Sequence, residues 1–206
     1  MKKLWLVSMM HDAADRIREA EPDLVGRTVA YIPTAVIAEG PEGALEEMAA
    51  EETKMLESLG LTVVMLEIST APAEKIKESL EKCDLIFVGG GNTFFLLQEL
   101  KRTGADKLLV REVEKGKMYI GESAGAVVAC PDIGYCAGMD DPGKAPELTE
   151  YSGLHLVDFY VVPHLGNPQM GPAAEQAIAD YSGKLDLKVI DDQQMILVED
   201  GKVSIL

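Results

Sequence analysis

Residues 117–129 read Lys-Met-Tyr-Ile-Gly-Glu-Ser-Ala-Gly-Ala-Val-Val-Ala. An apolar run ends at Gly121-Glu122-Ser123-Ala124-Gly125 and passes at once into small residues that suit a helix. A strand followed by Gly-x-Ser-x-Gly and a helix predicts a nucleophile elbow, because the two glycines let the backbones approach closely around a strained serine. We therefore expect Ser123 to be a nucleophile, with the N–H of Ala124 at the helix start stabilising negative charge.

Apolar runs alternate with helical patterns on both sides of this elbow. The sequence predicts strands at 3–9, 27–33, 61–68, 85–88, 158–162 and 188–190, and helices over 45–59, 73–82, 93–101, 106–115 and 172–181. Short strands that are apolar on both faces, separated by helices, are typical of an α/β fold with a mostly parallel sheet and helices on both faces. A hairpin is expected at the end, with strands at 195–199 and 203–206 joined by Asp200-Gly201. We expect one domain over residues 1–206.

Composition excludes several classes of partner. The net charge is −16, from 35 acidic against 19 basic residues, and such a field does not attract nucleic acid or an anionic membrane. No apolar run approaches the ~20 residues of a membrane helix, and the first apolar segment is too short for a signal peptide, so we expect a cytoplasmic protein. The three cysteines are an odd number and lack metal-ligand spacing.

A second motif, Val88-Gly89-Gly90-Gly91-Asn92-Thr93, lies between a strand and a helix. Its spacing fits neither a dinucleotide fingerprint nor a phosphate-binding loop. In an open α/β sheet, ligands bind beyond the carboxyl ends of the strands, so this loop and the elbow should share one edge. We interpret its bare N–H groups as completing an oxyanion hole with Ala124; the plainer alternative is a tight turn that only needs glycine.

A serine nucleophile needs a base, and the chain has three histidines. His164 follows a strand and precedes a turn, which places it at the functional edge. His155 lies in an alternating pattern that indicates a solvent-facing position, and His11 is as well explained by a surface position. His164 is therefore the predicted base.

The acid that would orient this base is not decided by the residues alone. Asp191 and Asp192 follow a strand, whereas Asp140 and Asp141 lie in the irregular stretch 131–153. A loop of that length inside a compact domain is usually functional.

Four segments in order, Phe87–Phe94, Tyr119–Ala126, Met139–Pro142 and Val162–His164, resemble the peptidase E family of aspartyl dipeptidases, which are distantly related to cyanophycinases. The resemblance spans nearly the whole chain. It implies a class I glutamine-amidotransferase-like α/β fold with serine in place of the nucleophilic cysteine. It also implies a cytoplasmic enzyme without metal or organic cofactor.

Carried onto this sequence, the resemblance implies Ser123 as nucleophile and His164 as base. It places the oxyanion donors on Ala124 and on Gly90 or Gly91. The acid falls on Asp192 or on Asp140; we prefer Asp192, because a residue at a strand end is held more rigidly than one in a long loop. We further expect Asn92 and Glu122 to bind substrate, with loop anchoring as the alternative role for Glu122, which stands where the family commonly has an aromatic residue.

The predicted function is hydrolysis of short peptides by a Ser-His-Asp triad, with dipeptides that begin with Asp as the substrates implied by the resemblance. Selecting that aspartate requires a cation or converging N–H donors; Lys144 and Arg111 are available but lack motif support. One alternative is the same machinery acting on an ester, isoaspartyl or β-aspartyl linkage. Another is an inactive relative that binds a small ligand. The oligomeric state stays open, with a homodimer among the states the sequence allows.

Overall fold

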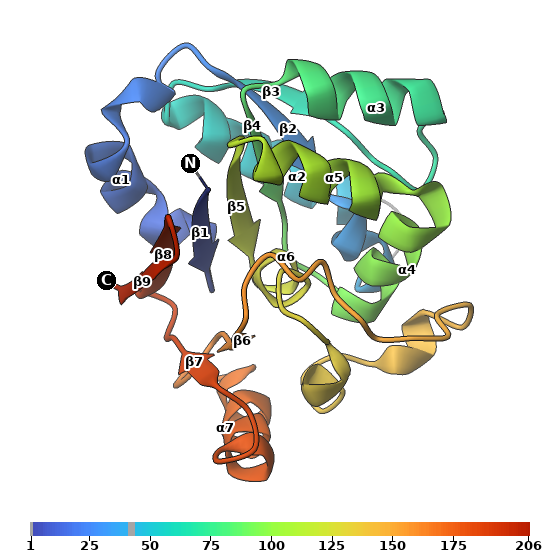
Figure 1. Ribbon diagram of the computed structural model, residues 1–206, viewed down its shortest axis with the longest axis vertical. Helices are drawn as coiled ribbons and strands as arrows, with labels where there is room; N and C mark the ends of the chain where they lie inside the picture. The colour runs from blue at the N-terminus through green and yellow to red at the C-terminus, as the bar shows by residue number, and fades with distance from the viewer. Residues whose placement is uncertain (1, 41–43) are drawn as a thin grey trace.

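The computed structural model describes residues 2–40 and 44–206, and within them the main sheet has seven strands in the order β3-β2-β4-β5-β1-β8-β9 (Figure 1). The strands are β1 Lys3–Val7, β2 Thr28–Ile32, β3 Thr62–Met65, β4 Leu85–Val88, β5 Met118–Glu122, β6 Tyr160–Val162, β7 Leu187–Val189, β8 Met195–Glu199 and β9 Lys202–Ile205. The α-helices are α1 Met10–Ala20, α2 Ala44–Ser58, α3 Ala73–Lys82, α4 Thr93–Thr103, α5 Ala105–Glu114, α6 Ala124–Val127 and α7 Gly171–Tyr181.

The strands β1 to β5 pair in parallel, and β8 joins β1 antiparallel. The terminal hairpin of β8 and β9 turns at Asp200-Gly201, where both residues have positive φ, 48° and 82°. That conformation is the one a two-residue hairpin turn of this twist requires. The prediction of a mostly parallel α/β sheet with a C-terminal hairpin is confirmed.

Helices cover both faces of the sheet, as predicted. On one face, Trp5 and Phe87 pack with Ile17 of α1 and Leu56 of α2. On the other face, apolar side chains of α3, α4 and α5 pack against Leu4, Ile86 and Tyr119. Because neighbouring residues of one strand enter different cores, the inner strands β1, β2, β4 and β5 are buried along nearly their whole length. Among the described helices, none is both long and apolar enough to cross a bilayer.

Helix α1 was not expected from the sequence. Its buried residues are Met10, Ala13, Ala14 and Ile17, which follow helical spacing. Two of these four are alanines, and charged residues surround them, so the apolar stripe is weak in the sequence. Tertiary packing against the sheet, rather than a strong amphipathic pattern, stabilises this helix.

The strands β6 and β7 form a separate two-stranded parallel sheet, shown below the main sheet in Figure 1. Their register pairs Tyr160 with Leu187 and Val162 with Val189. The segments that follow the two strands therefore leave the small sheet side by side.

Close backbone contacts explain the two glycines of the elbow. A Cβ on Gly121 would lie 2.5 Å from the carbonyl oxygen of Gly125, and a Cβ on Gly125 would lie 2.1 Å from that of Val88. Both partners are backbone atoms of packed elements and have little freedom to move. Glycine at these positions lets α6 lie directly against β4 and β5.

We expect Gly125→Ala to lower the free energy of unfolding by about 3 kcal/mol, because the added methyl overpacks a rigid contact. Urea denaturation of both proteins checks this. Gly138→Ala is the matched control: a Cβ there has no neighbour within 4 Å, so its unfolding free energy should stay within about 0.5 kcal/mol of the wild type. Equal stability of the two variants would contradict the packing argument.

Candidate active site

Ser123 occupies a strained bend between β5 and α6. Its φ of 48° and ψ of −109° lie outside the usual regions for a residue with a side chain; such a conformation costs about 1–3 kcal/mol and persists only where the surroundings hold it. The N–H of Ser123 donates to the carbonyl oxygen of Val7 at 2.9 Å. Behind it, the buried hydroxyl of Tyr119 donates to the carbonyl oxygen of Gly125 at 2.6 Å. The serine side chain is half-buried and faces a hollow.

Two further side chains extend a hydrogen-bonded chain from this hydroxyl. The Oγ of Ser123 lies 2.8 Å from Nε2 of His164, and Nδ1 of His164 lies 2.8 Å from Oδ1 of Asp192. With Nδ1 carrying its proton toward the carboxylate, Nε2 is free to accept the serine proton. The structure thus brings together the predicted nucleophile, the predicted base and the preferred acid.

The small sheet of β6 and β7 accounts for the meeting of His164 and Asp192, which are separated by 28 residues. After the paired Val162 and Val189, the ladder continues through Ile190, whose N–H donates to the carbonyl oxygen of Val162 at 3.0 Å. The two residues therefore follow neighbouring strand ends. His164 itself has a positive φ of 67°, a second strained position in the site.

Two residues that the sequence analysis did not single out hold this arrangement. The buried hydroxyl of Ser8, just past β1, accepts from the N–H of His164 at 3.0 Å. The amide of Asn167 donates to Oδ2 of Asp192 at 2.6 Å. Both had a sequence signal: Ser8 is polar at the end of an apolar strand, and Asn167 lies in the turn three residues after His164.

Asp140, the alternative acid, makes a different contact. Its Oδ2 accepts from the N–H of Thr93 at 2.9 Å, at the start of α4. Burial raises the pKa of Asp140, and its hydrogen bonds to Thr93 partly offset this. The carboxyl group lines the same hollow as Ser123, but the Nδ1 contact of His164 goes to Asp192.

The glycine loop lies beside the serine. A Cβ on Gly90 would be 3.3 Å from the Cβ of Ser123, and Gly91 has a φ of 124° with its Cβ position 2.3 Å from the backbone of Ala35. Within the described part of the chain, the N–H groups of Gly90, Gly91 and Ala124 make no hydrogen bond to another group. They are placed where the predicted oxyanion donors would have to lie, and the close approach to Ala35 explains why residue 91 is glycine.

Asn92 uses both ends of its side chain within the protein. It is fully buried; its Oδ1 accepts from the N–H of Phe95 at 3.0 Å, which caps α4, and its Nδ2 donates to the carbonyl oxygen of Asp141 at 3.2 Å. These contacts tie the 131–153 segment to α4. They are structural contacts, whereas the sequence had suggested contact with substrate.

Glu122, the last residue of β5, lies beside α1 and α2, where it lines a hollow together with Met10 and Glu52. Its Oε1 accepts from the N–H of Met10 at 2.7 Å, at the start of α1, so it anchors that helix to the elbow. Burial, and then the neighbouring carboxyl group of Glu52, raise the pKa of Glu122 to about 8. This carboxyl group is therefore largely protonated at neutral pH.

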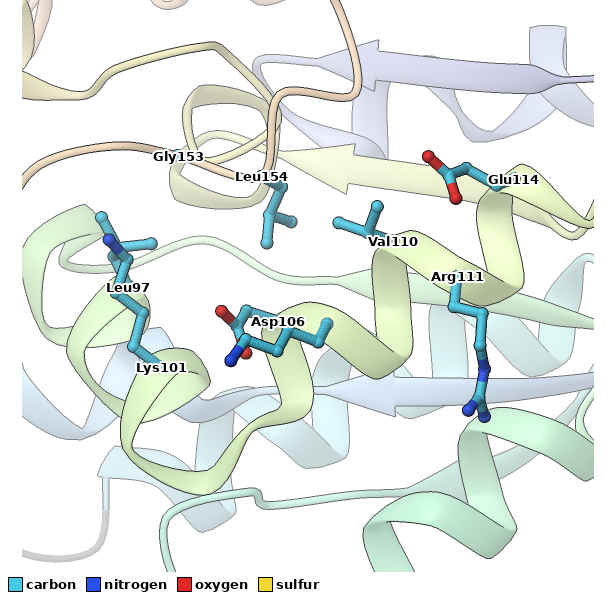
Figure 2. Close-up of a pocket in the computed structure, with 9 residues that line it drawn as sticks. Leu97, Lys101, Asp106, Val110, Arg111, Glu114, Gly153 and Leu154 are labelled. Carbon is cyan, nitrogen blue, oxygen red and sulfur yellow. The ribbon is translucent and has the colours of Figure 1, made fainter.

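The hollow in front of Ser123 has a volume of about 360 Å³. Methionine side chains line part of it, with the carboxyl groups of Glu39 and Asp140, and no lysine or arginine among the described residues lines it. Lys144 is not part of this lining, and Arg111 lies elsewhere: it borders a separate hollow of about 270 Å³ between α4, α5 and Gly153-Leu154 (Figure 2). The guanidinium of Arg111 forms an ion pair with Glu81 of α3 at 2.7 Å. No cluster of His, Cys, Asp or Glu in the described ranges could hold a metal ion.

Known peptidases are similar to this chain over most of its length. A model of peptidase family S51 matches residues 7–206. An uncharacterized peptidase of Listeria innocua is 46% identical over 203 residues, covering 98% of this chain and 95% of the relative. A peptidase E of Salmonella arizonae is 32% identical over 160 residues, covering 75% of this chain and 64% of that protein. A solved Listeria monocytogenes structure named for peptidase E superposes with a TM-score of 0.92 at 43% identity, covering 100% of this chain and 98% of that one.

The raised pKa of Glu122 leads to a prediction about stability. The folded protein holds a proton that the unfolded chain, with an ordinary pKa of 4.5, releases; the resulting stabilisation is fully present below pH 4.5 and is lost as the pH rises through about 8. Glu122→Gln keeps an oxygen for the N–H of Met10 but cannot ionise. We expect the unfolding free energy of this variant to fall less between pH 5 and pH 9 than that of the wild type.

Urea denaturation at a series of pH values measures this difference. The pKa of Glu52 is also raised by burial, and its hydrogen bonds to Tyr31 and to Glu122 partly offset this increase. Parallel profiles for wild type and variant would show that Glu122 does not hold its proton in the folded protein.

Proposed function

Because this chain belongs to peptidase family S51, we propose that it is a serine peptidase that hydrolyses short peptides, with Ser123, His164 and Asp192 as a catalytic triad. The observation that carries the proposal is the unbroken contact chain from Oγ through the imidazole to the carboxylate, 2.8 Å at each step. The strained backbone at Ser123 supports it, since strain of this kind is found where a side chain is held ready for reaction.

In this mechanism, Nε2 of His164 takes the proton of Ser123 as Oγ attacks the scissile carbonyl carbon. The C–N bond then breaks, and the imidazolium returns the proton to the departing amine, leaving an acyl-serine. Water attacks the ester by the same route in reverse and releases the acid. Asp192 holds the imidazole tautomer and stabilises its positive charge, and Asn167 holds Asp192 in place.

The oxyanion formed in both steps needs donors that are already in place. The N–H groups of Ala124 and of Gly90 or Gly91 are suited to this because they surround the serine and have no other described partner. Fixed donors of this kind cost no reorganisation as charge develops. The packing of Gly91 against Ala35 supports a rigid loop in this role.

The preference for an N-terminal aspartate stays a prediction from the family resemblance. A β-carboxylate entering the hollow would meet Glu39 and Asp140, without a lysine or arginine among the lining residues described. Like charges at close range repel, and the repulsion is strongest where water is excluded. The charges of the hollow therefore do not favour a substrate with an acidic side chain at this place.

We expect Ser123→Ala to lower kcat for any peptide that the wild type cleaves by several orders of magnitude, because the nucleophile is lost while the packing of the elbow is kept. A library of dipeptides and tripeptides, with Asp-X, isoaspartyl, β-aspartyl-arginine and ester compounds included, measures this and separates the alternative acyl substrates. Full hydrolysis by the alanine variant would refute the proposal. A wild type that neither cleaves the panel nor reacts with a fluorophosphonate would point to the inactive ligand-binding alternative.

The choice of acid has its own test. Asp192→Asn should lower kcat by about 10³–10⁴, because the amide favours the wrong imidazole tautomer. Asp140→Asn is the matched control: the same change in the same hollow, on a carboxyl group that contacts Thr93 instead of His164, should cost far less. Steady-state kinetics of both variants, with the peptide of the library that the wild type cleaves fastest, decides between the two acids. A larger loss for the Asp140 variant would transfer the role to that residue.

A further inference from the structure

Two acidic side chains lie next to the elbow, Glu52 of α2 and Glu122 at the end of β5, and we call them the carboxyl pair. We infer that the carboxyl pair shares one proton, and that this proton keeps the elbow and the glycine loop in the positions that reaction at Ser123 requires. Glu52 is then a positioning residue, which acts on the serine through Glu122 and through the loop. The role rests on the proposed function, because its effect is measured at the serine.

The hydrogen bonding of the carboxyl pair requires a proton on one of the two groups. The side chains of Glu52 and Glu122 are in hydrogen-bond contact, and an ionised carboxylate has no donor. Glu52 also accepts from the hydroxyl of Tyr31, and Glu122 accepts at Oε1 from the N–H of Met10. With Glu122 protonated and Glu52 ionised, each of these contacts joins a donor to an acceptor.

The surroundings of the pair offer no lysine or arginine among the described residues that line its hollow. The titratable groups that face it are His11 of α1, Tyr31 of β2 and Glu51 of α2. Burial raises the pKa of both acids, and the neighbouring Glu52 helps to raise that of Glu122 to about 8. Two acids in contact without a counter-charge do not both ionise at neutral pH. The residues that face the pair without a titratable group are Val7 of β1, Met10 of α1, Met48 and Met55 of α2, and Gly89 of the glycine loop.

The carboxyl pair borders both of the segments that surround the serine. Glu122 immediately precedes Ser123, and a Cβ on Gly89 would lie 3.0 Å from Oε2 of Glu52. The next residue of the loop, Gly90, adjoins the nucleophile: a Cβ there would lie 3.3 Å from the Cβ of Ser123. The pair therefore bridges the elbow and the loop that carries the predicted oxyanion donors.

Loss of the shared proton changes an attraction into a repulsion. Two adjacent carboxylates in partly buried surroundings repel each other strongly, and the repulsion acts on the packing of α2 and of the glycine loop against the elbow. Met48 of α2 lines the catalytic hollow as well, so a shift of this helix also moves the wall of that hollow. The reactivity of Ser123 should therefore fall at alkaline pH, in a step that does not involve His164.

The test measures the rate constant for inactivation by a fluorophosphonate between pH 7 and pH 9.5, because this probe reacts with the serine and carries no titrating group. We expect the wild-type rate constant to fall by about tenfold over this range, since a group whose pKa is about 8 loses nearly all of its proton there. A rate constant that stays level or rises up to pH 9.5 would overturn the inference.

Glutamine variants identify the groups responsible. Glu122→Gln and Glu52→Gln each leave a single acid, so no repulsion develops, and each rate constant should stay within about twofold from pH 7 to pH 9.5. The second variant covers the case in which the first fails to fold. Glu51→Gln and His11→Gln, in the same hollow but outside the pair, should show the wild-type fall. A fall retained in both pair variants, or lost in either control, would overturn the assignment to the carboxyl pair.

The shared proton is also measured without catalysis, by infrared difference spectra between pH 7 and pH 9.5. We expect the wild type to lose the carbonyl absorption of a protonated carboxylic acid over this range, and Glu122→Gln to lack this change. A wild type without the change would overturn the shared proton. If the fluorophosphonate labels Ser123 at no pH, the proposed function fails and the positioning role fails with it, whereas the infrared change would still support the shared proton.

Discussion

The short turn from β1 into α1 is the connection on which the site depends. Its first carbonyl, that of Val7, accepts from the N–H of Ser123, and its serine, Ser8, accepts from the N–H of His164. Two residues further on, the N–H of Met10, the first residue of α1, donates to Glu122. Val7, Ser8 and Met10 of this one turn thus hold Ser123, His164 and Glu122 in place. β1 can do this because it lies directly beside β5 in the sheet.

The strain at the site is local, and the packing that sustains it is extensive. Ser123 and His164 both have positive φ without being glycine. Each costs free energy that a flexible loop could not sustain. Both are held by main-chain hydrogen bonds to neighbours from distant parts of the sequence, and the glycines of the elbow let α6 lie close enough to β4 to complete the support. The imidazole and the hydroxyl are therefore positioned before any substrate arrives.

The parts of the fold that could be predicted from sequence were those with strong local patterns. The buried strands, the hairpin at Asp200-Gly201 and the Gly-x-Ser-x-Gly elbow each have a short-range signature that matches what the structure contains. Helix α1 was missed because half of its buried stripe is alanine. The pairing of β6 with β7 is a contact between distant segments, so the residues alone could not separate Asp192 from Asp140. For Asn92, sequence shows a polar residue next to a glycine loop, but only the fold shows that both ends of its side chain are occupied.

The separation of the small sheet from the main one has a consequence for how this centre assembles. Ser123 follows β5 of the seven-stranded sheet. His164 and Asp192, which contact each other, follow β6 and β7 of the small sheet. A shift of the small sheet relative to the main sheet would lengthen the contact between Oγ of Ser123 and Nε2 of His164. It would leave the contact between Nδ1 of His164 and Oδ1 of Asp192 intact. The proposed triad is therefore complete only where the two sheets pack together, and we expect the Oγ–Nε2 contact to form last as the chain folds and to be lost first as it unfolds.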